Sequence, residues 1–296
     1  MFERLKNYYQ SVLIGQRLRR LSEEEKRLGE NITCVVFSMN RAMQLHALLK
    51  SLYANCTSEL DIVVLYKATT TDHVSSYREL KSEFLNTSFI EQGESFKEDL
   101  GSIFELITNT KMFFLVDDIV FINNFDMNKL KEINPRNNIF SFRLGSQLSY
   151  SYVVQKEQVL PKFRKVDEYL SWDWREGVLD WSYPLSVDGH LFDTSEMEIL
   201  VNSLHYSAPN SFENALQYVK RFFLGRAGLC CSTSVIVNIP CNRVQDEVLN
   251  LSGDVNPDEL LLMWKKGYQI DLESLRGYRN NSVHEIIPFH FIERAK

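Results

Sequence analysis

The first part of the chain alternates short apolar runs with segments of helical periodicity. The apolar runs have the length and composition of strands, and they lie at residues 32–37, 61–66, 88–91 and 112–116. Between them, apolar residues recur at the i, i+3, i+4, i+7 spacing of a helix with one buried face, at residues 45–52, 75–84 and 96–107. Strands that alternate with helices in this way predict an α/β fold with a mostly parallel sheet flanked by helices.

The most informative run is FFLVDDIVF, which contains two adjacent carboxylates, Asp117 and Asp118. A continuous apolar run is typical of a strand covered on both faces, so we interpret it as a buried strand with the acidic pair near its end. Ionised carboxylates are costly to bury unless they are paired or bind a metal. The pair therefore indicates a site for a hard divalent cation, with phosphate oxygens completing its shell. The alternative is that the pair begins a solvated turn.

Polar side chains follow several of the predicted strands. They are Ser38, Asn40, Arg41, Lys67, Glu91, Asp117 and Asp118. Because ligands of parallel α/β sheets bind beyond the carboxyl ends of the strands, we expect these side chains to converge on one rim. The Ser38 hydroxyl and the Asn40 amide can bind a nucleotide, and the guanidinium of Arg41 suits a diphosphate.

The second half of the chain is less regular. Strands are predicted at residues 139–144, 185–192 and 234–239, and helices at residues 196–204, 212–223 and 258–266. The segment Asp188-Gly189-His190 interrupts the second of these strands. The first 30 residues predict a further helix, and its basic, amphipathic start fits either an anionic membrane surface or packing on another helix.

Composition narrows the class of protein. With 296 residues, 44% hydrophobic and 24% charged, the chain fits one large globular α/β domain or a domain with an appendage. Its net charge of -6 argues against a nucleic-acid-binding protein, which usually carries a basic surface. The five cysteines show no zinc or CxxC spacing, which predicts free thiols in a reducing compartment. No signal peptide or membrane-spanning run is visible, so the expected location is the cytoplasm.

Three common motifs are absent from the sequence. There is no GxxxxGK[ST] loop of the P-loop nucleotidases, no GxGxxG after the first strand and no GxSxG elbow. The first loop is instead Ser-Met-Asn-Arg. These absences argue against P-loop, dinucleotide-binding and serine-hydrolase chemistry.

Taken in order, four segments resemble the GT-A glycosyltransferases, in particular the broad family-2-like group that builds bacterial surface polysaccharides. The segments are VVFSMNRAMQLHALLKSL, DIVVLY, SFKEDLGSIFELI and FFLVDDIVF, the last in the place of the DxD motif. The resemblance covers about residues 31–245, with a nucleotide-binding half at 31–125 and an acceptor half at 126–245. It leaves an N-terminal amphipathic helix at 1–30 and a C-terminal helical extension at 246–296.

The resemblance implies transfer of a sugar from a nucleotide-diphosphate sugar to a saccharide or lipid-linked saccharide acceptor, with inversion and with Mg2+ or Mn2+ as cofactor. The metal-binding motif falls on Asp117 and Asp118, and a late histidine of the family corresponds to His284 as a further metal ligand. Ile119 stands where a D-x-D counted from Asp117 needs an acid. One carboxylate is therefore expected to bind the metal and the other the ribose. The basic N-terminal helix would suit peripheral contact with the inner face of the cell membrane.

The resemblance also implies the residues that hold the nucleotide. They are Ser38, Asn40, Arg41, Lys67, Glu91, Lys97 and Asp117. Lys67 and Glu91 would lie near the nucleobase or ribose. Lys97 would flank the same pocket, unless it belongs to the solvated start of a helix.

Inverting members of the family use a carboxylate as general base, and two residues are candidates. Glu213 lies at a predicted helix start, where it can alternatively form a capping box with Asn210. Asp188 can alternatively be a turn residue before Gly189. The acceptor would contact His190, Asn242 and Trp181, although His and Trp side chains are also common in packed cores.

Two other functions remain open on the sequence. A nucleotidyltransferase also combines an α/β sheet with acidic metal ligands, but it usually carries a glycine-rich first loop, which is missing here. A catalytically impaired, nucleotide-binding scaffold of a polysaccharide assembly complex fits the incomplete DxD motif.

Overall fold

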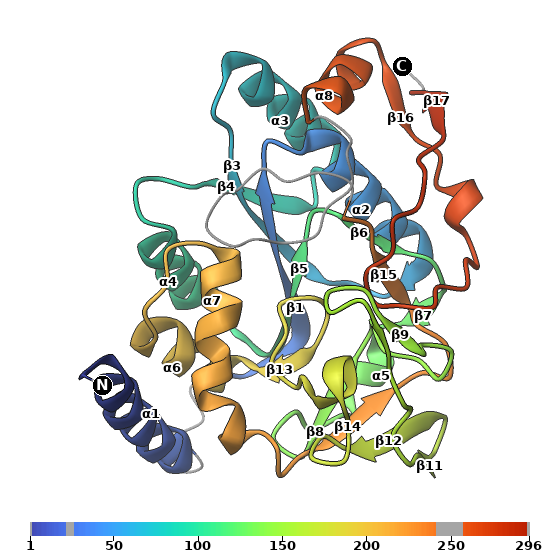
Figure 1. The fold of residues 1–296 in the computed structure, drawn as a ribbon. Coiled ribbons are helices and arrows are strands. Elements are labelled where there is room, and N and C mark those ends of the chain that lie inside the picture. Colours follow the sequence, from blue (N-terminus) through green and yellow to red (C-terminus); the bar gives the residue numbers. More distant parts are fainter. Residues whose placement is uncertain (1, 22–26, 241–256, 295–296) are drawn as a thin grey trace.

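A computed structural model of the protein describes residues 2–21, 27–240 and 257–294. Its centre is a five-stranded sheet in the order β13-β5-β1-β3-β4 (Figure 1). The strands are β1 (Gly29–Met39), β3 (Asp61–Lys67), β4 (Thr87–Glu91), β5 (Asn109–Val116) and β13 (Leu191–Asp193). All neighbours pair in parallel except β13, which runs antiparallel to β5 at one edge. The predicted α/β class with a mainly parallel sheet is confirmed.

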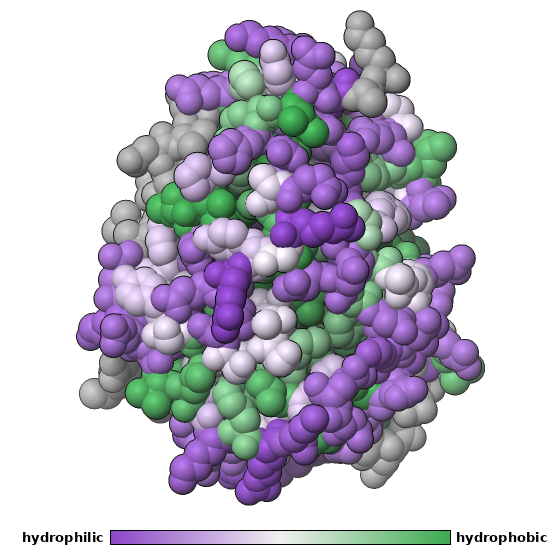
Figure 2. Space-filling view, turned by 90° about the vertical axis from the view of Figure 1, so that its right-hand side faces the viewer, coloured by the Kyte–Doolittle hydropathy of each residue, from purple (hydrophilic) through white to green (hydrophobic). Residues whose placement is uncertain are grey.

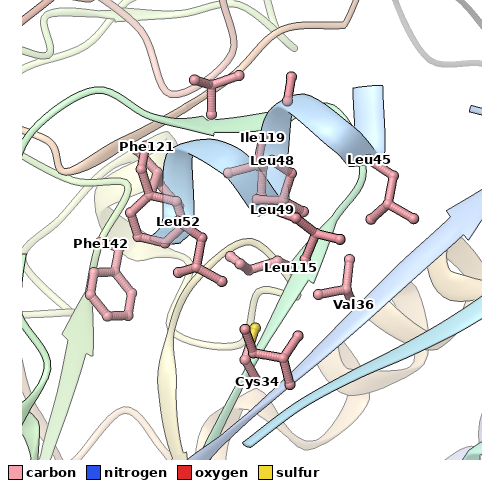
Figure 3. Packing of buried hydrophobic residues seen from close by; sticks show 14 of the residues in the cluster. Cys34, Val36, Leu45, Leu48, Leu49, Leu52, Leu115, Ile119, Phe121 and Phe142 are labelled. Atoms are coloured by element: carbon pink, nitrogen blue, oxygen red, sulfur yellow. The ribbon is translucent and has the colours of Figure 1, made fainter. Parts of the chain in front are cut away.

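Helices cover both faces of this sheet, because successive side chains of a strand point to opposite sides. Cys34 and Val36 of β1 face the cluster that includes α2 (Ala42–Asn55) and α3 (Thr71–Glu83). Figure 3 shows the leucines of α2 directed at Val36 and at Leu115 of β5. Val35 and Phe37 face the opposite cluster, to which α4 (Phe96–Leu106), α6 (Thr194–Ser203) and α7 (Pro209–Leu216) contribute. The helix α1 (Phe2–Arg20) packs on α6 and the 3-10 helix η3 (Gln217–Phe222).

A second sheet lies beyond one edge of the first. Its order is β11-β12-β14-β8, with β8 (Asn138–Ser141), β11 (Arg164–Val166), β12 (Tyr169–Asp173) and β14 (Ala227–Cys230). Trp172 of β12 donates from its indole nitrogen to the carbonyl of Trp181, in the 3-10 helix η2 (Leu179–Ser182), at 3.0 Å, and the rings of Trp172 and Trp174 meet edge to face. These indoles form part of a core, so they do not offer a stacking surface.

The C-terminal part returns to the central sheet. It contains α8 (Pro257–Lys265), the 3-10 helix η4 (Glu273–Leu275), and the antiparallel pair of β16 (Tyr268–Ile270) and β17 (Phe291–Glu293). The region predicted as a helical extension therefore also holds strands. Between η4 and β17, His284 forms an isolated parallel bridge with Asn238 of β15 (Ile236–Asn238), which pairs with β6 (Ile119–Phe121). This bridge places a late residue of the chain beside the end of β5.

Short strand pairs and one short helix complete the described fold. They are β2 (Cys56–Thr57) with β7 (Phe125–Asp126), β9 (Tyr150–Ser151) with β10 (Lys156–Glu157), and α5 (Asn128–Lys131). Polar side chains cover most of the face shown in Figure 2, and apolar ones gather there only in small separate groups. No helix in the described ranges has the length and apolar character that would let it cross a bilayer.

Two predicted strands differ from the structure. The run at residues 113–121 is not one strand: β5 ends at Val116, Asp117 and Asp118 form a turn, and β6 follows. The predicted strand at residues 185–192 is mostly irregular, because only Leu191 and the residues after it pair with β5. Gly189 in that segment has φ +73, and a Cβ there would lie 2.6 Å from the Cδ1 of Ile236. The segment therefore turns tightly against the core, which a regular strand does not allow.

Candidate active site

The turn after β5 carries the acidic pair to the carboxyl end of β1. The backbone N–H of Asp117 donates to the carbonyl of Phe37 at 3.1 Å, which extends the strand pairing by one bond. Its side-chain Oδ2 accepts from the Ser38 hydroxyl at 2.8 Å and from the Met39 backbone N–H at 3.1 Å. Asp117 is buried. Its carboxylate is thus held by the end of β1.

Arg41 joins the two carboxylates. Its Nη1 lies 3.0 Å from Oδ1 of Asp117 and 3.2 Å from Oδ2 of Asp118. The backbone N–H of Arg41 donates to the Tyr77 hydroxyl at 3.2 Å, and that hydroxyl also lies 2.6 Å from the Ser38 hydroxyl. Burial raises the pKa of Tyr77, and the charge of Asp117 adds to the shift. A neutral phenol therefore fixes the loop that carries the guanidinium.

Asp118 has one oxygen without a partner. Its Oδ1 is buried and accepts no hydrogen bond from the described part of the chain. Burial raises the pKa of Asp118 to about 6, the charges of Asp117 and Asp188 add to the shift, and Arg41 and His284 oppose it. An unpartnered buried carboxylate oxygen is costly, so this oxygen favours the approach of a cation or a proton.

Asp188, whose charge acts on Asp118, belongs to a second charged group. Oδ2 of Asp188 is 3.1 Å from Nη1 of Arg143 and 3.4 Å from Nε2 of His284. Burial acts to raise the pKa of Asp188, but the contact with His284 and the charge of Arg143 outweigh burial and hold the pKa below its ordinary value. Asp188 is therefore an ionised, paired carboxylate.

Glu213 is connected to the same group through Ser186. Its Oε1 accepts from the Ser186 hydroxyl at 2.8 Å and from the Val187 backbone N–H at 3.1 Å. Ser186 in turn accepts from Nη1 of Arg143 at 3.0 Å. Glu213 is partly buried, and its Oε2 makes no hydrogen bond with the residues that the structure describes. Burial raises the pKa of Glu213, the charge of Asp188 adds to the shift, and Arg143 opposes it. The capping box of α7 uses Ser211 as its third residue, so Glu213 is not its partner there.

Arg143, Ser186 and Tyr77 are site residues that sequence reasoning missed. Arg143 carried a usable signal, because it is a lone cation in the apolar run IFSFRLG and is buried in the structure. A buried cation needs an anionic partner, just as the acidic pair needs a cation. Ser186 and Tyr77 are common residue types whose contacts depend on tertiary packing.

Three residues predicted to bind the nucleotide lie farther along the same rim. Asn40, in the left-handed region with φ 55, donates from its amide to the Thr69 hydroxyl at 2.8 Å, and its backbone N–H donates to the carbonyl of Lys67 at 3.0 Å. Glu91 accepts from the Tyr66 hydroxyl at 3.0 Å. These contacts bring the loops after β1 and β3 together, next to the end of β4.

Lys97, His190 and Trp181 make contacts away from the acidic pair. Lys97 donates to the carbonyl of Leu204 at 2.6 Å, beside α6. His190 and Trp181, predicted to contact the acceptor, are both fully buried, so neither side chain lines an open surface in this structure. His190 lies behind Asp188, 3.0 Å from the carbonyl of Pro184 through Nδ1, and burial lowers its pKa to about 3. Asn242 lies outside the described residues.

The donor atoms fit a divalent cation only together with a ligand. No three His, Cys, Asp or Glu side chains within the described ranges are grouped so that they could hold a metal ion. Mg2+ in phosphate-binding sites, however, commonly takes one or two protein ligands and completes its shell with phosphate oxygens and water. Asp118 Oδ1 and His284 Nδ1 are both buried and without a partner among the described residues. These two atoms each have a lone pair available to a cation, whereas both oxygens of Asp117 are already bonded.

Comparisons with known proteins give structural similarity only. No family model matches the sequence, and no curated protein matches it. The mannosyltransferase PcManGT of Pyrobaculum calidifontis, solved with GDP-Man and Mn2+, is 14% identical over 46% of this chain and 44% of its own, with a TM-score of 0.30. TarS 1-349 of S. aureus, solved with UDP-GlcNAc, is 12% identical over 80% of this chain and 72% of its own, with a TM-score of 0.45.

A third solved structure belongs to a different class of enzyme. A nucleotidyl transferase of Methanothermobacter is 9% identical over 70% of this chain and 89% of its own, with a TM-score of 0.39. The match to PcManGT, at 44%, covers less than half of that chain. All three TM-scores are below 0.5, so they decide nothing about activity. What the site can do follows from the charged groups gathered where β1 and β5 end.

Proposed function

We propose that the protein is a GT-A glycosyltransferase that moves a sugar from a nucleotide-diphosphate sugar to a saccharide or lipid-linked saccharide acceptor, with inversion. The observation that carries the proposal is the joining of Arg41 to both Asp117 and Asp118 at the carboxyl ends of β1 and β5. Ligands of α/β sheets bind at this edge, and a guanidinium beside an acidic pair suits a diphosphate with its cation.

The donor side is built from the proposed nucleotide-binding half, residues 31–125. Ser38 and Asp117 hold the loop, Arg41 binds the diphosphate, and Asn40, Lys67 and Glu91 lie toward the nucleoside. Asp118 and His284 would hold Mg2+ or Mn2+, which would supply charge to stabilise the leaving nucleoside diphosphate. Arg41 adds a permanent positive charge for the same leaving group.

Glu213 is the proposed general base, from the acceptor half, residues 126–245. Its pKa is raised, and its Oε2 accepts no hydrogen bond from a described residue. The acceptor hydroxyl gives its proton to Oε2 while its oxygen forms a bond to the anomeric carbon. The bond from that carbon to the diphosphate oxygen breaks, and the electron pair leaves with the nucleoside diphosphate. A base with a pKa closer to neutral is the more effective one.

Asp188 is the alternative base, but its contacts favour a positioning role. Its lowered pKa makes it the weaker proton acceptor, and Arg143 and His284 both engage Oδ2. Asp188 then orients sugar hydroxyls and keeps Arg143 and His284 in place.

The reaction is proposed to take place in the cytoplasm, in the assembly of a bacterial surface polysaccharide. Peripheral contact with the inner face of the membrane is supported by the basic last turn of α1, which holds Arg17, Arg19 and Arg20. Such contact would bring the site close to lipid-linked acceptors.

Calorimetry with UDP, GDP, dTDP and CMP, with and without Mn2+, tests the proposal. One nucleoside diphosphate is expected to bind, more tightly with Mn2+, and its sugar conjugates are then screened for turnover. Absence of binding to every nucleotide under both conditions would sink the proposal. Binding without any turnover of the matching sugar nucleotides would favour a non-catalytic scaffold.

A further inference from the structure

One nitrogen of Arg41 takes the position between the two aspartates. Nη1 carries two hydrogens and lies within hydrogen-bond distance of Asp117 on one side and Asp118 on the other. The side chains of Arg41 and Asp118 are each 11% exposed and that of Asp117 is 5% exposed. Charge-assisted hydrogen bonds that are this well shielded from water belong to the strong class.

A divalent cation and this guanidinium compete for the same carboxylate. A metal on Asp118 would lie close to Nη1, and two positive charges at such a distance repel each other strongly in a shielded site. The unpartnered Oδ1 of Asp118 and Nδ1 of His284 attract a cation, but Oδ2 of Asp118 is engaged by Arg41. Without a ligand, the guanidinium of Arg41 thus already balances negative charge on Asp117 and Asp118.

The backbone of Arg41 is fixed, whereas its side chain has several rotatable bonds. The backbone N–H donates to the Tyr77 hydroxyl, and the carbonyl accepts from the N–H of Leu45 at 2.9 Å, in the first turn of α2. Asp117 is fixed too, by Ser38 and Met39. The guanidinium can therefore change partner while the backbone of Arg41 stays in place.

We propose that Arg41 closes the cation site and that a nucleoside diphosphate opens it. The inference rests on the proposed function. A diphosphate offers the guanidinium paired oxygens at a higher charge than one carboxylate, so Arg41 turns from Asp118 to the phosphate. Both oxygens of Asp118 then become available, and the repulsion from Nη1 falls. Nucleotide and metal bind with positive coupling, and each raises the affinity for the other by the same factor.

The decisive experiment uses Mn2+ alone, without nucleotide, and measures its dissociation constant by calorimetry and by the EPR signal of free Mn2+. Wild-type protein is expected to bind Mn2+ weakly, and Arg41→Gln is expected to bind it about tenfold more tightly. Arg175→Gln is the matched control, because Arg175 is an exposed arginine that pairs only with Asp173 among the described residues, and it should leave the constant unchanged.

A second arm repeats the titration with the nucleoside diphosphate that binds. In wild type the nucleotide should tighten Mn2+ binding about tenfold, and in Arg41→Gln this coupling should fall to about twofold or less. Circular dichroism and melting confirm folding. If Arg41→Gln does not fold, Arg41→Lys replaces it, with an expected tightening of about threefold, since an ammonium lacks the planar fork.

Mn2+ affinity that is the same in folded Arg41→Gln and wild type would overturn the inference. So would a wild-type affinity that the nucleotide does not change. Both outcomes leave nucleotide binding itself intact, so they are distinct from failure of the proposed function, in which no nucleotide binds at all.

Discussion

Oδ2 of Asp188 lies 3.4 Å from Nε2 of His284, and this contact joins the middle of the chain to its C-terminal segment. His284 reaches that position through its bridge to Asn238, next to the turn that carries the acidic pair. A segment that lies beyond residue 245, where the sequence resemblance ends, thus contacts Asp188.

Replacing His284 should weaken nucleotide binding only when metal is present. His284→Ala removes one of the two unpartnered donor atoms, and we expect a loss of affinity of about tenfold for the nucleoside diphosphate with Mn2+ and little change in EDTA. Calorimetry under both conditions measures this difference. His290→Ala is the control, because His290 is exposed in the same segment. An equal loss in EDTA would contradict a metal-ligand role.

Glu213→Gln should abolish most sugar transfer but leave the fold and donor binding intact. The amide oxygen can still accept from Ser186 and Val187, so the local structure persists. Loss of the proton acceptor should lower the turnover number by about 10²–10⁴-fold. Steady-state kinetics with the donor identified by calorimetry measure the effect.

Asp188→Asn distinguishes the two candidate bases. If Asp188 only positions its neighbours, this variant should raise the Michaelis constant and lower the melting temperature, with a smaller loss of turnover than Glu213→Gln. The opposite order of turnover losses would move the role of base to Asp188.

Removing Arg143 should destabilise the protein strongly. Arg143→Met removes the guanidinium from the buried Asp188 and leaves only His284 beside it, and breaking a buried pair costs about 3–5 kcal/mol of the free energy of unfolding. Urea denaturation of each single variant and of the double variant Arg143→Met/Asp188→Asn measures the coupling free energy between the two residues. The double variant should recover part of the loss. Arg175→Met, at an exposed ion pair, should change stability little. A loss in Arg143→Met as small as in this control would exclude the pair as a structural element.

The two buried histidines His46 and His190 should lower stability as the pH falls from about 6.5 toward 4, whereas the raised pKa values of Asp118 and Glu213 act in the opposite direction. Burial lowers the pKa of His46 to about 4 and that of His190 to about 3, so both are neutral in the folded protein. In the unfolded chain, both histidines bind a proton near pH 6.5. The unfolded chain therefore takes up protons at a higher pH than the folded protein does, and this lowers the free energy of unfolding as the pH falls. Each histidine contributes a slope of up to about 1.4 kcal/mol per pH unit. Denaturation at several pH values should show His46→Gln reducing this slope, and an unchanged slope would contradict burial of a neutral His46.

The sequence predicted the four parallel strands of the central sheet and the acidic rim because both depend on local order along the chain. Ser38, Arg41, Asp117 and Asp118 follow apolar runs, and the parallel arrangement alone brings strand ends together. Arg143 could not be placed in this way, because its partners Ser186 and Asp188 lie on an irregular segment. The positions of Lys97 and Trp181 could not be predicted for the same reason. Distant elements such as α6 and β12 decide which face of a helix or loop packs inward.

The bridge between Asn238 and His284 has a practical consequence for anyone dividing this protein into fragments. A protein shortened at residue 245, where the resemblance ends, would lose His284 and also Trp264, whose ring stacks edge-on against His46 of α2. Such a fragment would expose an apolar flank and lack one proposed metal ligand, so inactivity or insolubility of the shortened form would say nothing against the proposed catalytic residues that it retains.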